Sequence, residues 1–196
     1  MYTPKPFSIT DESEIHRFIE ANAFGQLIST VNGRFTSTHM PFLLSDDKSK
    51  LYGHMARQNP QWQHLSGQEV MITLEGAHDY ISPNWYLNKG VPTWNYQAAH
   101  AYGNASIIDS NESLALVLKK LTEKYESNFE KPWIPDYDPK MLNAIVGIEI
   151  NITEIQCKYK LSQNKPREER ENIASNLKQQ GSMRLSESMT SELNRN

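Results

Sequence analysis

The sequence has few of the residues that build disulfide-stapled, membrane-spanning or secreted proteins. It holds a single cysteine, Cys157, among 196 residues, so it has no internal disulfide framework and suits a reducing compartment. No apolar run approaches the ~20 residues that a helix needs to cross a bilayer. The first residues lack the apolar region of a secretory signal. These absences predict a soluble cytoplasmic protein.

A strong charge of one sign is also missing. The chain carries 20 Lys and Arg against 23 Asp and Glu, a net charge of −3. The excess is uneven, because residues 1–157 hold 12 basic and 18 acidic residues while residues 158–196 hold eight and five. Binding to nucleic acid phosphates needs a basic surface. Direct DNA binding is therefore not expected of the body of the protein, and a contact with a protein partner is assigned to the C-terminal tail.

Motifs of the common catalytic and nucleotide-binding folds are absent as well. The sequence contains no Gly-x-Ser-x-Gly, no P-loop, no dinucleotide fingerprint and no basic recognition helix. None of the histidines forms an i, i+4 pair of the kind that binds a metal on one helix face. They lie at positions 16, 39, 54, 64, 78 and 100. No metal site is predicted, and no catalytic residue can be assigned.

What the sequence does contain is a series of short strand-forming runs. Asn32-Gly33 lies between two of them, residues 26–31 and 34–40, and is the favoured two-residue hairpin turn because both positions need positive φ. Periodicity and capping also predict helices over 11–22 and 110–127 and a short helix that starts at Asn59-Pro60. Strands are predicted over 51–55, 70–74, 96–108 and 146–152, and residues 157–161 either extend the last strand or form another. Residues 76–93 are predicted to form a loop. This pattern predicts a mainly β (α+β) fold, an antiparallel barrel or sandwich with peripheral helices.

Composition changes near residue 165. A polar helix is predicted over 166–179, with Asn164 as its cap and Gly181 beyond its end. The residues from 182 onward are rich in Ser, Asn and Met and are expected to be weakly ordered or to order on a partner. The predicted organisation is one domain over 1–164, followed by a C-terminal polar helix and flexible tail over 165–196.

The segment Gly53–Trp62 has the chemistry of a phosphate cradle. A strand ends, Arg57 follows, and Asn59-Pro60 starts a capped helix. A helix N-terminus presents free N–H groups, and an adjacent Arg supplies a bidentate fork for an anion. The alternative is an ordinary strand-to-helix turn with a solvated Arg, and the local residues do not exclude it.

Two further segments suit a flat ligand. Residues 80–86 and 91–96 place five large aromatic side chains within seventeen positions, and rings beside polar groups can stack on a heteroaromatic molecule. Lys158 and Lys160 end a strand, where a cation can stabilise a reduced flavin-type ring. The alternatives are a loop packed by its own aromatics and an edge strand protected by lysines.

At these same segments the sequence resembles the PaiB family of FMN-binding negative transcriptional regulators. The blocks run from end to end in order. They are Met1-Tyr2-x-Pro4, Thr38-His39-Met40-Pro41, Gly53-His54-x-Ala56-x-x-Asn59-Pro60-Gln61-Trp62, Tyr80-Ile81-Ser82-Pro83-x-Trp85-Tyr86, Val91-Pro92-Thr93-Trp94-Asn95-Tyr96-x-Ala98-x-His100-x-Tyr102-Gly103, Ile145-Val146-Gly147 and Tyr159-Lys160-Leu161-Ser162-Gln163-Asn164. The Pro-Thr-Trp-Asn-Tyr and Lys-Leu-Ser-Gln-Asn blocks are the most specific.

The resemblance implies an FMN-binding split β-barrel over residues 1–164, working as a homodimer with FMN in grooves between the chains. Carried over by position, Arg57 and Asn59 would hold the FMN phosphate, and His54, Met55 and Ala56 would line the ribityl chain. Thr38, His39 and Met40 would face the edge of the isoalloxazine ring. Trp94, Asn95, Lys160 and Gln163 would close the site, from the same chain or from the second.

The family's role in repressing sporulation and degradative-enzyme genes implies a flavin-responsive regulator. An FMN-dependent oxidoreductase, of the flavin-reductase kind and acting on a small substrate, is the main alternative. Haem binding or degradation, as in some split-barrel relatives, is a weaker one, with His39, His54 and His100 as ligands. The residues alone do not choose among the three.

Overall fold

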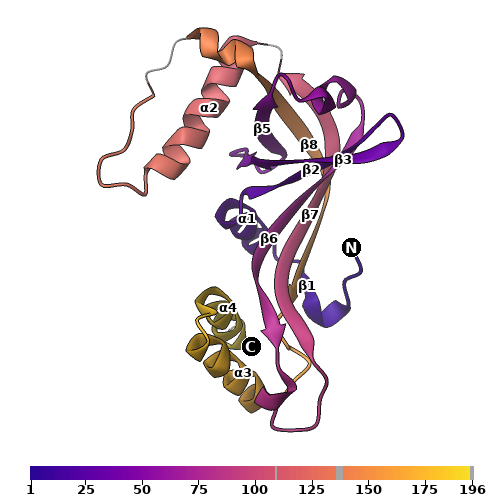
Figure 1. Ribbon diagram of the computed structural model, residues 1–196, viewed down its shortest axis with the longest axis vertical. Coiled ribbons are helices and arrows are strands. Elements are labelled where there is room, and N and C mark those ends of the chain that lie inside the picture. Colours follow the sequence, from indigo (N-terminus) through magenta and orange to yellow (C-terminus); the bar gives the residue numbers. More distant parts are fainter. Residues whose placement is uncertain (109, 136–138, 195–196) are drawn as a thin grey trace. The chain divides into compact units, whose positions relative to one another are not determined.

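The computed structural model describes residues 1–108, 110–135 and 139–194 (Figure 1). Its strands form one antiparallel sheet in the order β3-β2-β6-β7-β8-β5-β4, with β1 pairing with β8. The strands are β1 Ser8–Ile9, β2 Phe24–Val31, β3 Arg34–Pro41, β4 Leu43–Leu44, β5 Lys50–Ala56, β6 Glu69–Ile81, β7 Thr93–Ile108 and β8 Ile145–Lys160. The α-helices are α1 Glu12–Ala21, α2 Asn111–Glu126, α3 Arg167–Gln179 and α4 Met183–Leu193, and the 3₁₀ helices are η1 Lys5–Phe7, η2 Pro60–His64, η3 Pro83–Trp85 and η4 Pro139–Ala144.

Contacts divide the described chain into two compact units. The barrel unit comprises residues 16–74 and 100–155, and the hairpin-helix unit comprises residues 1–15, 75–99 and 156–194. Strands β6, β7 and β8 contribute residues to both units. Residues 165–194 belong to the same unit as the end of β8, and a domain boundary between residues 164 and 165 stays a prediction.

The predicted hairpin is confirmed. Asn32 and Gly33 have φ of 50° and 76°, and Val31 pairs with Arg34 across the two-residue turn. Gly25 has a second constraint in the same sheet, because a Cβ there would lie 2.2 Å from the carbonyl oxygen of Thr73. Only glycine permits this close approach of β2 to β6.

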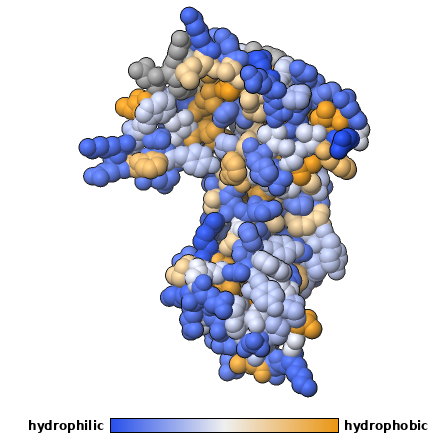
Figure 2. All heavy atoms as spheres, viewed as in Figure 1, coloured by the Kyte–Doolittle hydropathy of each residue, from blue (hydrophilic) through white to orange (hydrophobic). Residues whose placement is uncertain are grey.

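The core of the barrel unit follows from alternation along its strands. In β5 the residues at alternate positions are buried, and β2 and β8 show the same period of two over part of their length. Fully buried apolar side chains fill the interior, namely Leu27, Phe42, Leu51, Ile72, Leu74, Ile148 and Ile150. Helix α2 buries Leu114, Val117 and Leu121 and lies against β4 and η4. Figure 2 shows apolar residues gathered between α2 and the neighbouring strands.

The loop predicted over residues 76–93 is wrong in its first part. Strand β6 continues to Ile81, and η3 follows at once. The strand was missed because Gly76 and Ala77 are both buried, which breaks the alternation that identifies a half-buried strand. Strand β8 likewise runs without a break to Lys160, so the alternative of a separate strand over 157–161 is excluded.

The C-terminal segment differs from the expectation of a weakly ordered end. Helix α4 occupies Met183–Leu193 and lies beside α3 (Figure 1). Leu185, Met189 and Leu193 are buried at intervals of four residues, and they pack where α3 buries Ile173 and Leu177. Three widely spaced apolar residues among Ser and Glu gave too weak a periodic signal. No helix in the described ranges is both long and apolar enough to cross a membrane.

Candidate functional site

In the barrel unit, the segment predicted to hold a phosphate is tied to the β2–β3 hairpin by a side-chain network. Asn59 Oδ1 accepts from the backbone N–H of Gln61 at 3.0 Å, and Asn59 Nδ2 donates to Thr38 Oγ1 at 2.8 Å. Thr38 donates in turn to Gln61 Oε1 at 2.5 Å. Gln61 is buried, and its Nε2 lies within bonding distance of Leu27 O, Ser29 Oγ and Thr36 O. Asn59 and Thr38 therefore fix the position of η2 relative to the hairpin.

The short helix itself offers less to an anion than the sequence suggested. Element η2 is a 3₁₀ helix of five residues, and the backbone N–H of Gln61 near its start already donates to Asn59, so that group is not available to an anion. Arg57 is exposed, but its Nε donates to Asn143 O at 2.7 Å and its Nη2 to Ile145 O at 2.9 Å. Its guanidinium lies 5.9 Å from the ring centre of Trp62. Arg57 is thus held in place by η4 and β8, with the rest of its fork facing solvent.

Strand β5 separates its predicted site residues by face. Met55 is buried in the core, as is Met40 of β3, so these two positions can offer a ligand only backbone atoms. His54 lies on the opposite face of β5, and its Nδ1 is buried without a hydrogen-bond partner in the described structure. Burial lowers the pKa of His54 below its usual value of 6.5, which favours the neutral imidazole.

The neighbouring hairpin presents an exposed stacked pair. The rings of His39 and Phe24 lie 6.3 Å apart with planes inclined by 28°, and both residues are exposed. Ala56 is exposed at the end of β5. The predicted site residues of the barrel unit therefore include the exposed ring of His39, the unpaired nitrogen of His54 and the partly exposed guanidinium of Arg57.

In the hairpin-helix unit, the two most specific blocks of the sequence bind each other. Lys160 Nζ donates to Thr93 Oγ1 and to Trp94 O, both at 2.5 Å. Asn95 is fully buried, and its Nδ2 donates to Ser162 Oγ at 2.9 Å. The Pro-Thr-Trp-Asn-Tyr block of β7 is thereby joined to the Lys-Leu-Ser-Gln-Asn block that ends β8.

Gln163 closes the turn after β8 rather than projecting from it. Its Oε1 accepts from Leu161 N at 2.8 Å, and its Nε2 donates to Tyr159 O at 2.6 Å. Ser162 has φ of 63°, which a non-glycine residue adopts only with such support. Burial, and then the nearby Lys158, lower the pKa of Lys160. The side chains of Asn95 and Gln163 are thus engaged within the protein.

Among the residues of this unit predicted to bind the cofactor, Trp94 has the most exposed side chain. Its side chain is 55% exposed and meets Tyr80 edge to face, with ring centres 6.2 Å apart. It lines a pocket of about 310 Å³ together with Glu75, His78, Tyr96, Gln97 and Ala98. The predicted aromatic cluster is thus partly assembled, with Trp94 and Tyr80 at the surface while Trp85 is buried.

Two residues of these networks were not singled out from the sequence. Gln61 and Ser162 are both buried. Gln61 is bonded to Thr38 of another block, and Ser162 is bonded to Asn95 of another block. Each lies inside a specific block, but a polar side chain in a loop or turn gives no periodic signal of burial. Their role could be recognised only from the pairing of blocks that lie far apart in the sequence, which the sequence alone does not show.

Comparison with known proteins places these observations in a family. Residues 1–154 match the family model described as "Putative FMN-binding domain". The chain is 40% identical over 185 residues to "Protease synthase and sporulation protein PAI 2" of Bacillus subtilis, covering 90% of this chain and 89% of the relative. It is also 29% identical over 218 residues to an uncharacterized protein of Emericella nidulans, covering 86% and 87%.

Solved structures agree on the fold. The flavocytochrome Anf3 of Azotobacter vinelandii matches with a TM-score of 0.62 and 16% identity, covering 78% of this chain and 69% of its own. The FAD and heme binding protein of Mycobacterium smegmatis matches with a TM-score of 0.64 and 12% identity, covering 78% and 73%. At these identities the likeness concerns the fold, the split β-barrel with peripheral helices.

The residues present fit a flavin mononucleotide. The unpaired, buried Nδ1 of His54 is a polar atom that a bound ligand can satisfy. Within the barrel unit, the exposed ring of His39 suits stacking on a planar heterocycle, and the exposed part of the Arg57 fork suits a phosphate. Within the hairpin-helix unit, the exposed ring of Trp94 has the same stacking chemistry. Sequence, fold and residues agree that the chain is a split-barrel member of the FMN-binding PaiB-like family, with FMN as its cofactor.

Proposed function

We propose that this protein is a cytoplasmic homodimer that regulates gene expression in response to its flavin. The proposal depends on the hydrogen bonds of four polar side chains, each from a different one of the seven family blocks. Thr38, Asn59, Asn95 and Gln163 are each engaged in bonds within the protein. Side chains fixed in this way can shape a cofactor site, and amide and hydroxyl groups do not titrate near neutral pH, so these four residues are not suited to act as general acid or base. The name of the Bacillus relative, a sporulation protein, supports a regulatory role.

The cofactor site we propose keeps all twelve predicted residues, in three roles. In the barrel unit, Arg57 would contact the phosphate, and the side chains of His39 and His54 would contact the ring system or the ribityl chain. In the hairpin-helix unit, Trp94 and Lys160 would contact the flavin of this chain or of the second chain. Met40, Met55 and Ala56 would contribute backbone atoms. The remaining residues, Thr38, Asn59, Asn95 and Gln163, would hold these groups in position. When bound, FMN supplies reversible one- and two-electron redox chemistry.

The homodimer is supported by the apolar surface of the hairpin-helix unit. Tyr80, Leu87, Val91 and Trp94 are between 42% and 74% exposed. Apolar side chains clustered in one short stretch of a surface commonly mark an interface. In the dimer we propose, this surface meets the second chain, which would complete each FMN site.

Any effect on transcription would be indirect or would pass through the C-terminal segment. Residues 1–157 carry the acidic excess, which opposes contact with DNA phosphates. A specific electrophoretic shift of promoter DNA by full-length protein whose basic residues after position 164 are replaced would contradict this.

An FMN-dependent oxidoreductase is the second candidate, and one observation favours it. His54 offers an unpaired nitrogen and a lowered pKa, which suits a group that takes up or releases a proton. The haem alternative stays a prediction for His39, His54 and His100, and the absorbance spectrum of the purified protein tests it directly.

Anaerobic mixing of the FMN-loaded protein with NADH or NADPH separates regulator from oxidoreductase. We expect the flavin absorbance to persist for minutes with either nicotinamide, while dithionite bleaches it at once. Bleaching within seconds by NADH or NADPH would contradict the proposed regulator and support the oxidoreductase. If bleaching occurs, His54→Gln serves as the follow-up variant, since loss of bleaching with retained FMN would assign the proton transfer to His54.

A further inference from the structure

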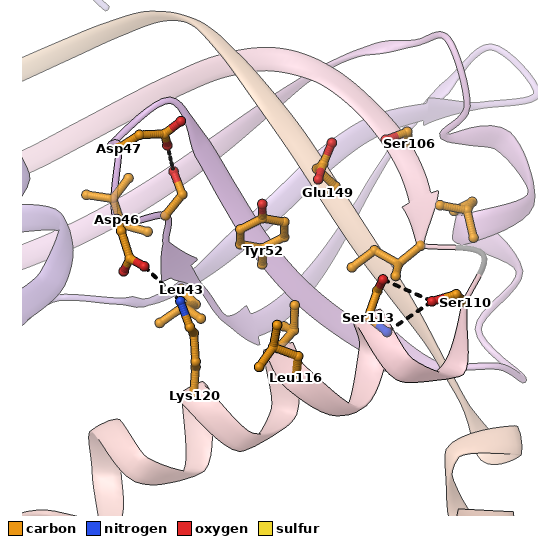
Figure 3. Close-up of a pocket in the computed structure, with 15 residues that line it drawn as sticks. Leu43, Asp46, Asp47, Tyr52, Ser106, Ser110, Ser113, Leu116, Lys120 and Glu149 are labelled. Carbon is orange, nitrogen blue, oxygen red and sulfur yellow. Dashed lines mark hydrogen bonds and ion pairs between the residues drawn. The ribbon is translucent and has the colours of Figure 1, made fainter.

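The barrel unit contains a pocket that the proposed function does not use. It lies between α2 and strands β4, β5, β7 and β8 and has a volume of about 590 Å³ (Figure 3). This volume falls in the range of sites for small molecules, roughly 300–1,000 Å³. None of the twelve residues predicted for FMN lines it. It is therefore a separate candidate for a ligand.

One side of the pocket is apolar. Its lining includes apolar side chains from three elements, Leu116 and Val117 of α2, Leu43 of β4 and Ile108 of β7. Leu116 is 57% exposed although it lies beside a buried face of the helix. An apolar ligand body placed here would cover this side chain and gain free energy from the area removed from water.

The other side carries a carboxylate beside an aromatic ring. Tyr52 and Glu149 are register partners on β5 and β8, and Figure 3 shows Tyr52 between Glu149 and Leu116. Lys50 Nζ binds Glu149 Oε1 at 2.9 Å, but Lys50 does not line the pocket. Burial, and then the charge of Glu149, raise the pKa of Tyr52, so its hydroxyl stays protonated at neutral pH.

The remaining charges give the pocket a negative balance. Three carboxylates line it, from Asp46, Asp47 and Glu149, against one ammonium group, from Lys120. Lys120 is bound to Asp46 at 2.9 Å. Asp47 accepts from Ser45 Oγ at 2.6 Å and from Ser49 N, and these bonds hold its pKa at about 2. Glu149 is thus the carboxylate that lies next to the aromatic ring and the apolar wall.

We propose that this pocket binds a small organic ammonium ion with an apolar body. The ammonium group would lie against the Glu149 carboxylate and the ring of Tyr52, and the body would rest on Leu43 and Leu116. A carboxylate and an aromatic face together favour an organic cation. Counting Lys50, which is paired with Glu149, three carboxylates stand against two ammonium groups, and the remaining negative charge disfavours an anion of the same shape. A neutral isostere lacks the charge that Glu149 attracts.

Isothermal titration of the full-length, FMN-loaded protein with three isosteric probes tests this. The probes are 2-phenylethylammonium, the neutral 2-phenylethanol and the anionic 3-phenylpropionate. We expect the ammonium ion to bind once per chain and at least about tenfold more tightly than the alcohol, the anion being weakest. Equal affinity for all three, or no heat of binding with the ammonium ion at millimolar concentration, would overturn the proposal.

Matched variants locate the site. Glu149→Gln should weaken the ammonium ion about tenfold and leave the alcohol nearly unchanged, since the side chain keeps its size and loses its charge, together with the ion pair to Lys50 outside the pocket lining. Glu112→Gln, on α2 but outside the pocket lining, should change neither. Ser113→Phe should block the pocket for both probes while the thermal unfolding of the protein remains cooperative. Unchanged affinity in Glu149→Gln, or in a folded Ser113→Phe protein, would contradict the assignment.

Discussion

The two units of this chain use their family motifs in opposite ways. In the barrel unit, Thr38, Asn59 and Gln61 are bonded to one another, while Nδ1 of His54 is buried without a hydrogen-bond partner in the described structure. In the hairpin-helix unit, Lys160 and Asn95 are bonded to the opposite block, and the outward-facing group is the ring of Trp94. The group without a hydrogen-bond partner in the barrel unit is thus a buried ring nitrogen, whereas the hairpin-helix unit offers an exposed aromatic ring.

The residues of the family blocks therefore fall into two groups with different roles. Gln61 and Asn95 are buried and hold two segments of chain together, whereas Arg57 and Trp94 are exposed and can meet a cofactor or a second chain. The variants below should therefore separate into those that lower stability and those that lower binding.

The largest effect is expected for Gln61→Leu. The change leaves Ser29, Thr36 and Thr38 without the partner that Gln61 supplies, which should cost about 3 kcal/mol of unfolding free energy. Urea denaturation measures it, with Gln58→Leu at an exposed neighbouring position as the control. A loss equal to that of the control would break the claim that the network holds the barrel unit together.

Asn95→Ala should be the next largest. Its side chain is fully buried and bonded to Ser162, so removal should cost about 2 kcal/mol. The exposed Asn164→Ala in the following turn is the matched control and should change stability by less than about 0.5 kcal/mol. If Asn95→Ala instead keeps full stability and loses FMN, Asn95 is a cofactor ligand and the contrast between the units fails.

Trp94→Ala should spare stability and weaken the proposed dimer about tenfold, because an exposed aromatic at an interface contributes on the order of 1–2 kcal/mol. Sedimentation equilibrium gives the dissociation constant. Trp133→Ala removes an equally exposed tryptophan from the barrel unit and should leave the dimer intact. The same dimer constant in both variants would remove Trp94 from the interface.

Arg57→Ala should weaken FMN several-fold while riboflavin, which lacks the phosphate, is little affected. The effect is limited because part of the Arg57 fork is bound to Asn143 and Ile145. Fluorescence titration with both flavins measures the ratio, and Arg34→Ala at the exposed hairpin serves as the control. Equal losses for FMN and riboflavin would assign Arg57 a structural role alone.

The smallest effect concerns pH. Burial lowers the pKa of His54, so the folded state binds this proton less readily than the unfolded state. The stability that the neutral imidazole confers is present above the unfolded value of 6.5 and is lost as pH falls through the lower folded value. Unfolding free energies measured between pH 7.5 and about 5 should decline more in the native protein than in His54→Gln. Parallel curves would show that His54 is not the group responsible.

Much of the fold could be predicted from the sequence, because the evidence is local. Asn32-Gly33 fixed the hairpin, Asn59 and Ser110 marked helix starts, and the apolar stripe of α2 gave its buried face. The extension of β6 and the helix α4 could not be predicted in this way, because small or widely spaced buried residues give little periodicity.

The site was predicted less completely, for a different reason. The motif blocks predict which residues hold the cofactor, and that assignment stays a prediction, but they do not indicate which side chains are bonded to one another. The pairing of Lys160 with Thr93, 67 residues away in sequence, is visible only once β7 and β8 are placed. Such pairings decide whether a polar residue faces a ligand or the protein.

Titration of FMN into the full-length protein freed of flavin tests the central claim most directly, with the mass in solution recorded alongside. We expect quenching of FMN fluorescence that saturates at one flavin per chain, on a species of twice the chain mass. Absence of quenching up to about 50 µM FMN would contradict it.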